Sequence, residues 1–154
     1  MREFNEADRK KKKARIQIQE NPDNLSRQAL AQLEDKVKDS LKNGYLSCPT
    51  AWKIAKDLSV SKIAVGEVVD RLSIRIENCQ IGFFKVAKTP YDNTDHKSVD
   101  GEFITALETL AENKQLTCMK IFELSGQFKL KPMTIANEAN VRDLKIRECQ
   151  LGCF

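Results

Sequence analysis

Histidine and glycine are scarce in this sequence, and their scarcity limits the chemistry that the chain can perform. The single histidine, His96, leaves general-base catalysis to carboxylates, and only six glycines stand among the 154 residues. The sequence has no G-x-x-x-x-G-K-[ST] loop, no G-x-G-x-x-G loop and no H-E-x-x-H pair, the arrangements that cradle phosphates or hold a catalytic zinc. We therefore predict that the protein is not an enzyme and needs no cofactor.

Long apolar runs are also missing. No stretch approaches the roughly 18 apolar residues that cross a membrane, and the N-terminus lacks the apolar segment of a secretory signal. Hydrophobic residues make up 41% of the chain and charged residues 31%. This balance predicts a folded cytoplasmic protein with no membrane contact.

Basic residues concentrate at the N-terminus. Residues 1–15 carry seven basic and three acidic groups, which accounts for the whole net charge of +4. The rest of the chain is electrically balanced, so affinity for nucleic acid requires this end or a local patch. We predict a basic N-terminal arm over residues 1–25, which acts either as a solvating tail or as a phosphate-seeking arm.

A shift of 70 residues places the two halves of the chain in register without a gap. Residues 46–48 (Leu-Ser-Cys) fall on residues 116–118 (Leu-Thr-Cys), and the string I-x-x-C-Q-[IL]-G-x-F recurs at 76–84 and 146–154. Two copies indicate a duplicated domain, because a solenoid needs at least three repeats. The predicted boundaries are a first module at 26–88, a polar linker at 89–99 and a second module at 100–154.

Each copy has the same order of expected elements. Apolar residues spaced by three and four predict the first helix. Pro49 suits the first turn of the second helix, and Ser61 can cap the third. In the first copy the elements are a helix at 33–42, an extended piece at 45–47, helices at 49–58 and 62–72, and a strand at 74–84. The sequence therefore predicts a mainly α (α+β) fold of two repeated three-helix modules with short strands.

The residues that would pack the second helix on the third carry a resemblance. Ala55 is a small residue where two helices must cross closely, and Ser125 is its counterpart. The apolar residues at this crossing are Ile54, Leu58, Val60, Val65 and Val68 in the first copy, and Leu124, Phe128, Leu130 and Ile135 in the second. Together with the element order, this pattern resembles the winged helix-turn-helix modules of prokaryotic transcription regulators. The second copy departs at Glu138, where Val68 stood, and no wing hairpin is evident after Ile74.

The resemblance implies that the third helix of a module lies in a DNA major groove, with its early residues facing the bases. In the first copy these positions are Ser61, Lys62, Gly66, Glu67 and Asp70. Two acids in that set oppose the approach of phosphates. We therefore expect the first module to contact the second module or a partner protein.

The second copy is the better candidate for reading DNA. Asn137 and Asn140 can make paired hydrogen bonds to adenine, and neighbouring lysines can neutralise phosphates. The candidate DNA-binding residues are Lys10, Lys11, Lys12, Lys13, Lys62, Lys129, Lys131, Asn137, Asn140 and Arg142. The alternative is that these are ordinary solvated helix faces.

Five cysteines are present, and four of them recur in register between the copies. The resemblance implies that the short strand pairs with the last one, which brings Cys48 near Cys79 and Cys118 near Cys149. The chain has no C-x-x-C, so zinc-ligand spacing is absent and we predict no metal. Buried apolar thiols are the favoured interpretation, and a redox or metal site is the alternative.

These features favour a transcriptional regulator that binds double-stranded DNA. Winged-helix modules also serve as protein-docking modules, so a protein-interaction adaptor is the alternative, with its partner on the first module. A cysteine-based redox- or metal-responsive switch is a third hypothesis. The sequence leaves the oligomeric state open.

Overall fold

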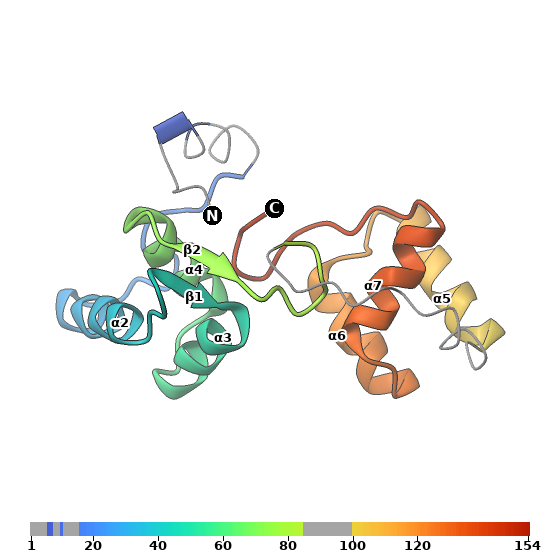
Figure 1. The fold of residues 1–154 in the computed structure, drawn as a ribbon, viewed down its shortest axis with the longest axis horizontal. Coiled ribbons are helices and arrows are strands. Elements are labelled where there is room, and N and C mark those ends of the chain that lie inside the picture. Colours follow the sequence, from blue (N-terminus) through green and yellow to red (C-terminus); the bar gives the residue numbers. More distant parts are fainter. Residues whose placement is uncertain (1–5, 8–9, 11–15, 85–99) are drawn as a thin grey trace. The chain divides into compact units, whose positions relative to one another are not determined.

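The structure is a computed structural model that describes residues 6, 7, 10, 16–84 and 100–154. Helices dominate it, and the sheet in the described residues has two short strands (Figure 1). The expected mainly α fold is confirmed. The chain divides into two compact units. Unit 1 comprises Met1–Cys79 with Gln150–Phe154, and unit 2 comprises residues 80–149.

Unit 1 holds three helices, each of which begins where a serine can cap it. They are α2 (Arg27–Asp39), α3 (Cys48–Asp57) and α4 (Lys62–Arg71). The hydroxyl groups of Ser26, Ser47 and Ser61 accept hydrogen bonds from backbone N–H groups of the first turn, which satisfies donors that the helix leaves open. The core between the helices is apolar, with Leu33, Leu46 and Val65 fully buried.

A two-stranded parallel sheet joins the helices of unit 1. Strand β1 (Tyr45–Ser47) pairs with β2 (Arg75–Glu77), with Leu46 opposite Ile76. The strand expected at 74–84 is therefore too long. Asn78 follows β2 in the left-handed conformation, at φ 52°, which turns the chain out of the extended path. No hairpin partner for β2 exists in the described residues, so the structure has no wing there.

Unit 2 repeats this order with α5 (Gly101–Glu112), α6 (Cys118–Phe128) and α7 (Pro132–Val141). Its sheet shrinks to a single parallel bridge between Thr117 and Arg147. Phe103 of α5 and Phe128 of α6 pack edge to face, with ring centroids 5.4 Å apart. The core of unit 2 thus contains an aromatic pair, while its sheet is smaller than that of unit 1.

The backbone turns at the same places in both copies. Left-handed conformations recur at five positions related by the 70-residue shift. These pairs are Gly44 and Lys114, Ser59 and Lys129, Ser73 and Asp143, Asn78 and Glu148, and Gly82 and Gly152. Because a residue other than glycine adopts this conformation at a cost of roughly 1–2 kcal/mol, the shared positions indicate one backbone design used twice.

The compact units differ from the sequence repeats at their ends. We call residues 80–84 the first closing segment and Gln150–Phe154 the second closing segment. The first belongs to unit 2, and the second belongs to unit 1. The modules expected at 26–88 and 100–154 each included their own closing segment.

No helix in the described part of the chain combines the length and the apolar content that a membrane span needs.

Candidate nucleic-acid interface

The turn that leads into α7 presents two lysines. The Ser125 hydroxyl donates to the Leu130 carbonyl at 2.7 Å, and Lys129 adopts the left-handed conformation at φ 56°. Lys131 is the N-cap of α7, but its side chain makes no capping bond. Both lysine side chains are exposed, at a helix end that carries a partial positive charge.

The helix itself leaves a polar stripe accessible. Asn137 is half-buried and Asn140 is exposed. They stand four and seven residues after Met133, a spacing that places all three on one face of α7. Two amides thus lie on one face of α7, the helix that follows the two lysines in the sequence.

Arg142, at the end of α7, is bound within unit 2. Its Nη1 donates to the backbone carbonyl of Glu138 at 3.1 Å and also to the Glu138 carboxylate. Glu138 is 1% exposed, so the guanidinium compensates a buried charge, and the Arg142 side chain is 31% exposed. The first copy has Val68 and Leu72 at these two positions. Replacement of an apolar pair by an ion pair is therefore a specific feature of α7.

At the N-terminal end of α4, the residues that correspond to the start of α7 bind other residues of unit 1. Lys62 Nζ donates to Gln150 Oε1 at 2.7 Å and lies 3.7 Å above the ring of Trp52. Ser61 donates to the Asp23 carboxylate through its backbone N–H at 2.6 Å and through its hydroxyl at 2.5 Å. The Lys62 side chain is therefore held by contacts inside unit 1. The side chains of Lys129 and Lys131 in unit 2 are exposed.

Two further α4 positions expected to face DNA are buried. A Cβ added to Gly66 would lie 2.0 Å from the carbonyl oxygen of Leu151, so the second closing segment lies directly on this helix. Glu67 is 7% exposed. The two residues therefore do not form the open face that the resemblance implies for a recognition helix, because Leu151 packs on Gly66 and Arg71 binds Glu67.

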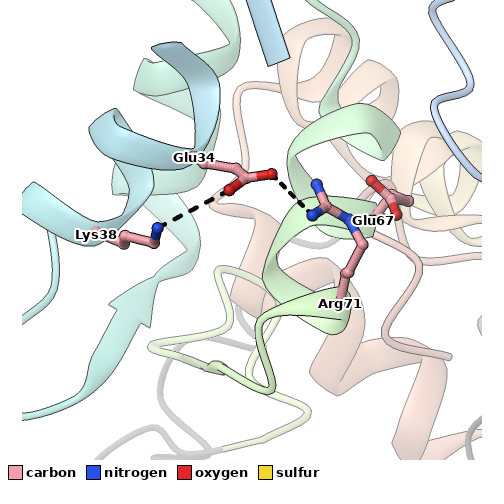
Figure 2. A network of polar contacts seen from close by, with 4 residues as sticks. All are labelled: Glu34, Lys38, Glu67 and Arg71. Atoms are coloured by element: carbon pink, nitrogen blue, oxygen red, sulfur yellow. Dashed lines mark hydrogen bonds and ion pairs between the residues drawn. The ribbon is translucent and has the colours of Figure 1, made fainter. Parts of the chain in front are cut away.

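The Glu67 carboxylate belongs to a network of charges between α2 and α4, drawn in Figure 2. Arg71 Nε donates to Glu67 at 3.2 Å, and its Nη1 lies 2.8 Å from a carboxylate oxygen of Glu34. Lys38 stands 3.8 Å from the other oxygen of Glu34. The hydrogen bond to Glu34, with the negative charge of Glu67, raises the pKa of Arg71. Through these contacts the guanidinium ties α4 to α2.

Only part of the expected basic arm falls within the described residues. Lys10 is exposed and stands 3.7 Å from Glu6. Lys11, Lys12 and Lys13 lie outside the described residues. The structure thus places Lys129, Lys131, Asn137, Asn140 and Arg142 together around one helix of unit 2, and it places Lys62 in the packing of unit 1.

The cysteines are only partly buried. Cys48, Cys79 and Cys118 are buried, whereas Cys149 and Cys153 are half-buried. Ser47 pairs with Glu77 in the parallel sheet, so Cys48 and Cys79, which follow these residues, lie at the same end of the sheet. The described residues contain no group of three or more side chains placed to hold a metal ion.

Sequence reasoning missed the role of Gln150 and Leu151. Gln150 is 88 residues from Lys62, too far for any local pattern to connect them. One signal was present in Gly66, because a glycine inside a helix costs roughly 1 kcal/mol relative to alanine, and glycine allows another backbone to approach closely. Position 136, its counterpart in α7, is an alanine.

Comparisons with protein-family models, with curated proteins and with solved structures gave no match to this chain.

Proposed function

We propose that this protein is a DNA-binding transcriptional regulator, without enzymatic activity, that acts in the cytoplasm through helix α7 of unit 2. The observation that carries the proposal is the accessible set on and before that helix. Lys129, Lys131 and Asn140 are exposed, and Asn137 is half-buried. A helix that follows a tight turn and keeps such residues accessible has the form of a recognition helix in a helix-turn-helix.

Local charge supports the same assignment. Residues 129–147 contain five basic and two acidic residues, and one of these acids, Glu138, is buried against Arg142. The equivalent residues 59–77 of unit 1 contain three of each sign. Phosphate attraction therefore favours unit 2, although the chain outside residues 1–15 is balanced as a whole.

The proposed division of roles follows from the side-chain chemistry. Lys129 and Lys131 contact phosphates at the N-terminal end of α7, where backbone N–H groups also favour an anion. Asn137 and Asn140 read base edges, since the amide of asparagine matches the donor and acceptor of adenine. Lys10, Lys11, Lys12 and Lys13 add attraction that does not depend on sequence.

Fluorescence anisotropy of the full chain with labelled duplex DNA at two salt concentrations tests this proposal. We expect binding at low salt that weakens as salt rises. Alanine at positions 10–13 should weaken binding to every duplex alike, and the salt slope should fall by about 0.9 for each lysine that binds a phosphate in the wild-type protein. Absence of binding at low salt overturns the proposal.

A protein-interaction adaptor is the second candidate, and a different observation favours it. The most exposed large apolar residues of the described chain are Phe83, Met119 and Val141, at 43%, 55% and 62%. All three belong to unit 2, so a docking partner would bind unit 2, which contains most of the second module. Retention of a stable protein partner by a chain that fails to bind DNA would support this candidate.

A further inference from the structure

The two closing segments share the string Q-[IL]-G-x-F, and each belongs to the unit that does not contain the rest of its own repeat. Ile81 of the first is 2% exposed and Leu151 of the second is 1% exposed. Each segment therefore contributes a fully buried apolar residue to the unit that receives it. Neither unit completes its core with its own repeat alone.

The receiving site on unit 1 is closely fitted. At Gly66 the backbone of Leu151 approaches so closely that a Cβ would lie 2.0 Å from its oxygen and 2.7 Å from its carbonyl carbon. Gln150 accepts the hydrogen bond from Lys62. Gly152, at φ +68°, would place a Cβ 2.5 Å from Ile18 and 3.0 Å from Ile63. The site on unit 1 therefore fits a segment that has the backbone path of Leu151, the amide of Gln150 and a glycine at position 152.

Unit 2 receives its segment through matching positions. Gly82, at φ +80°, lies against the side chain of Met133, with a Cβ position 3.4 Å from Met133 Cγ. Met133 stands 70 residues after Ile63, and Gly152 stands 70 residues after Gly82. The same glycine of one repeat meets the same helix position of the other in both units.

Both receiving sites bind only a short local stretch of chain. They do not require that stretch to come from the same molecule, and a second copy carries the same sequence. Exchange of an identical element between protomers is a low-cost route to dimers. Within one molecule the segment is present at an effective concentration on the order of mM, so exchange between wild-type molecules should become extensive only near that concentration.

We propose that this protein self-associates by exchanging closing segments, so that unit 1 of one molecule holds residues 150–154 of a second copy against Gly66 of α4. The partner is a second copy of this chain, and its contribution completes the core of unit 1. Self-association of this kind does not depend on DNA binding.

Two complementary variants of the full chain test the proposal. Gly66→Val blocks the receiving site and leaves the segment intact, whereas Leu151→Asp spoils the segment and leaves the site intact. Neither variant can close its own unit 1. When mixed, the intact segment of the first can enter the intact site of the second. Native mass spectrometry should therefore detect one-to-one heterodimers in the mixture at micromolar concentration, where wild type is monomeric.

Two controls guard against misfolding of the variants. Gly126→Val adds a side chain at a helical glycine where a Cβ meets nothing within 4 Å, and its mixture with Leu151→Asp should form no heterodimer above the wild-type level. Two wild-type populations with different tags should also form mixed dimers at millimolar concentration. Monomers alone in the complementary mixture, or no mixed dimers between tagged wild-type chains at millimolar concentration, overturn the proposal.

Discussion

Helices α4 and α7 occupy equivalent positions in the two repeats, yet their surroundings differ. Both are ten residues long and begin 70 residues apart. In α4 the six consecutive residues 64–69 are all buried, and its first turn is engaged by Asp23 and Gln150. In α7 residues 135, 136, 138 and 139 are buried as well. The difference lies at three positions, because Thr134 and Asn137 are half-buried and Asn140 is exposed, whereas Ala64 and Glu67 are buried and Asp70 is half-buried.

This difference indicates how a duplicated module can divide its tasks. The backbone turns at the same five places in both copies, so the fold tolerates both solutions. Unit 1 uses its third helix for internal packing. Unit 2 also packs its third helix but leaves Thr134, Asn137 and Asn140 more accessible than their counterparts. Through Glu138 and Arg142 it holds a charged pair where unit 1 has Val68 and Leu72.

The largest expected effect concerns the two glycines that lie inside helices, Gly66 and Gly126. Gly66→Ala should destabilise the protein by about 3 kcal/mol, the upper end of the range for overpacking, because the added Cβ would meet the backbone of Leu151. Gly126→Ala meets nothing within 4 Å and should stabilise by up to about 1 kcal/mol through helix propensity. Urea unfolding of both variants measures this contrast. Equal effects of the same sign would show that the second closing segment does not rest on α4.

The charged pair of unit 2 can be converted to the apolar pair of unit 1. Arg142→Leu alone should cost about 3 kcal/mol, the lower end of the range for breaking a buried ion pair, because it leaves the Glu138 carboxylate buried without its cation. The double change Glu138→Val with Arg142→Leu should be neutral or stabilising, since apolar replacement of a buried ion pair often is. Urea unfolding of the single and double variants measures how the unfolding free energy depends on the Glu138–Arg142 pair. A double variant less stable than Arg142→Leu would contradict this account.

The two amides of α7 can be replaced by the acids of α4. Asn137 and Asn140 stand 70 residues after Glu67 and Asp70. Asn137→Glu with Asn140→Asp should remove base contacts worth roughly 1–3 kcal/mol each and add repulsion from phosphates. Anisotropy titration with a duplex selected from a random library measures the decrease in affinity. Asp70→Asn in unit 1 is the matched control and should leave affinity unchanged.

Lys62 should matter for stability. Lys62→Met removes the hydrogen bond to Gln150 and the interaction with the Trp52 ring, which together should cost about 1–2 kcal/mol of unfolding free energy. Thermal unfolding checks this change. An unaltered melting temperature would indicate that Lys62 is not engaged in solution.

Local elements were largely predictable from the sequence because their signals are local. The helices expected at 49–58 and 62–72 correspond to Cys48–Asp57 and Lys62–Arg71. The first helix begins at Arg27 instead of 33, next to Ser26, from which the spacing of Leu30, Leu33 and Val37 already predicts a helix. Ser26, which caps it, was the available signal.

The assignment of the closing segments could not be predicted from their sequences. Residues 76–84 and 146–154 share the same string, so either copy of it fits either unit by pattern. What distinguishes the units is the long-range packing of Leu151 on Gly66. The same packing removes Gly66 from the candidate DNA face, and helical periodicity carries no sign of it.

The most direct test of the division between the units compares lysines at equivalent ends of α4 and α7. Anisotropy with duplex DNA at two salt concentrations should be measured for Lys129→Ala with Lys131→Ala and for Lys62→Ala. The account predicts that the double variant lowers the salt slope by about 1.8, for two phosphate contacts, and that Lys62→Ala leaves the slope at its wild-type value. An equal or greater decrease in Lys62→Ala, or an unchanged slope in the double variant, would contradict the claim that unit 2 binds DNA through α7.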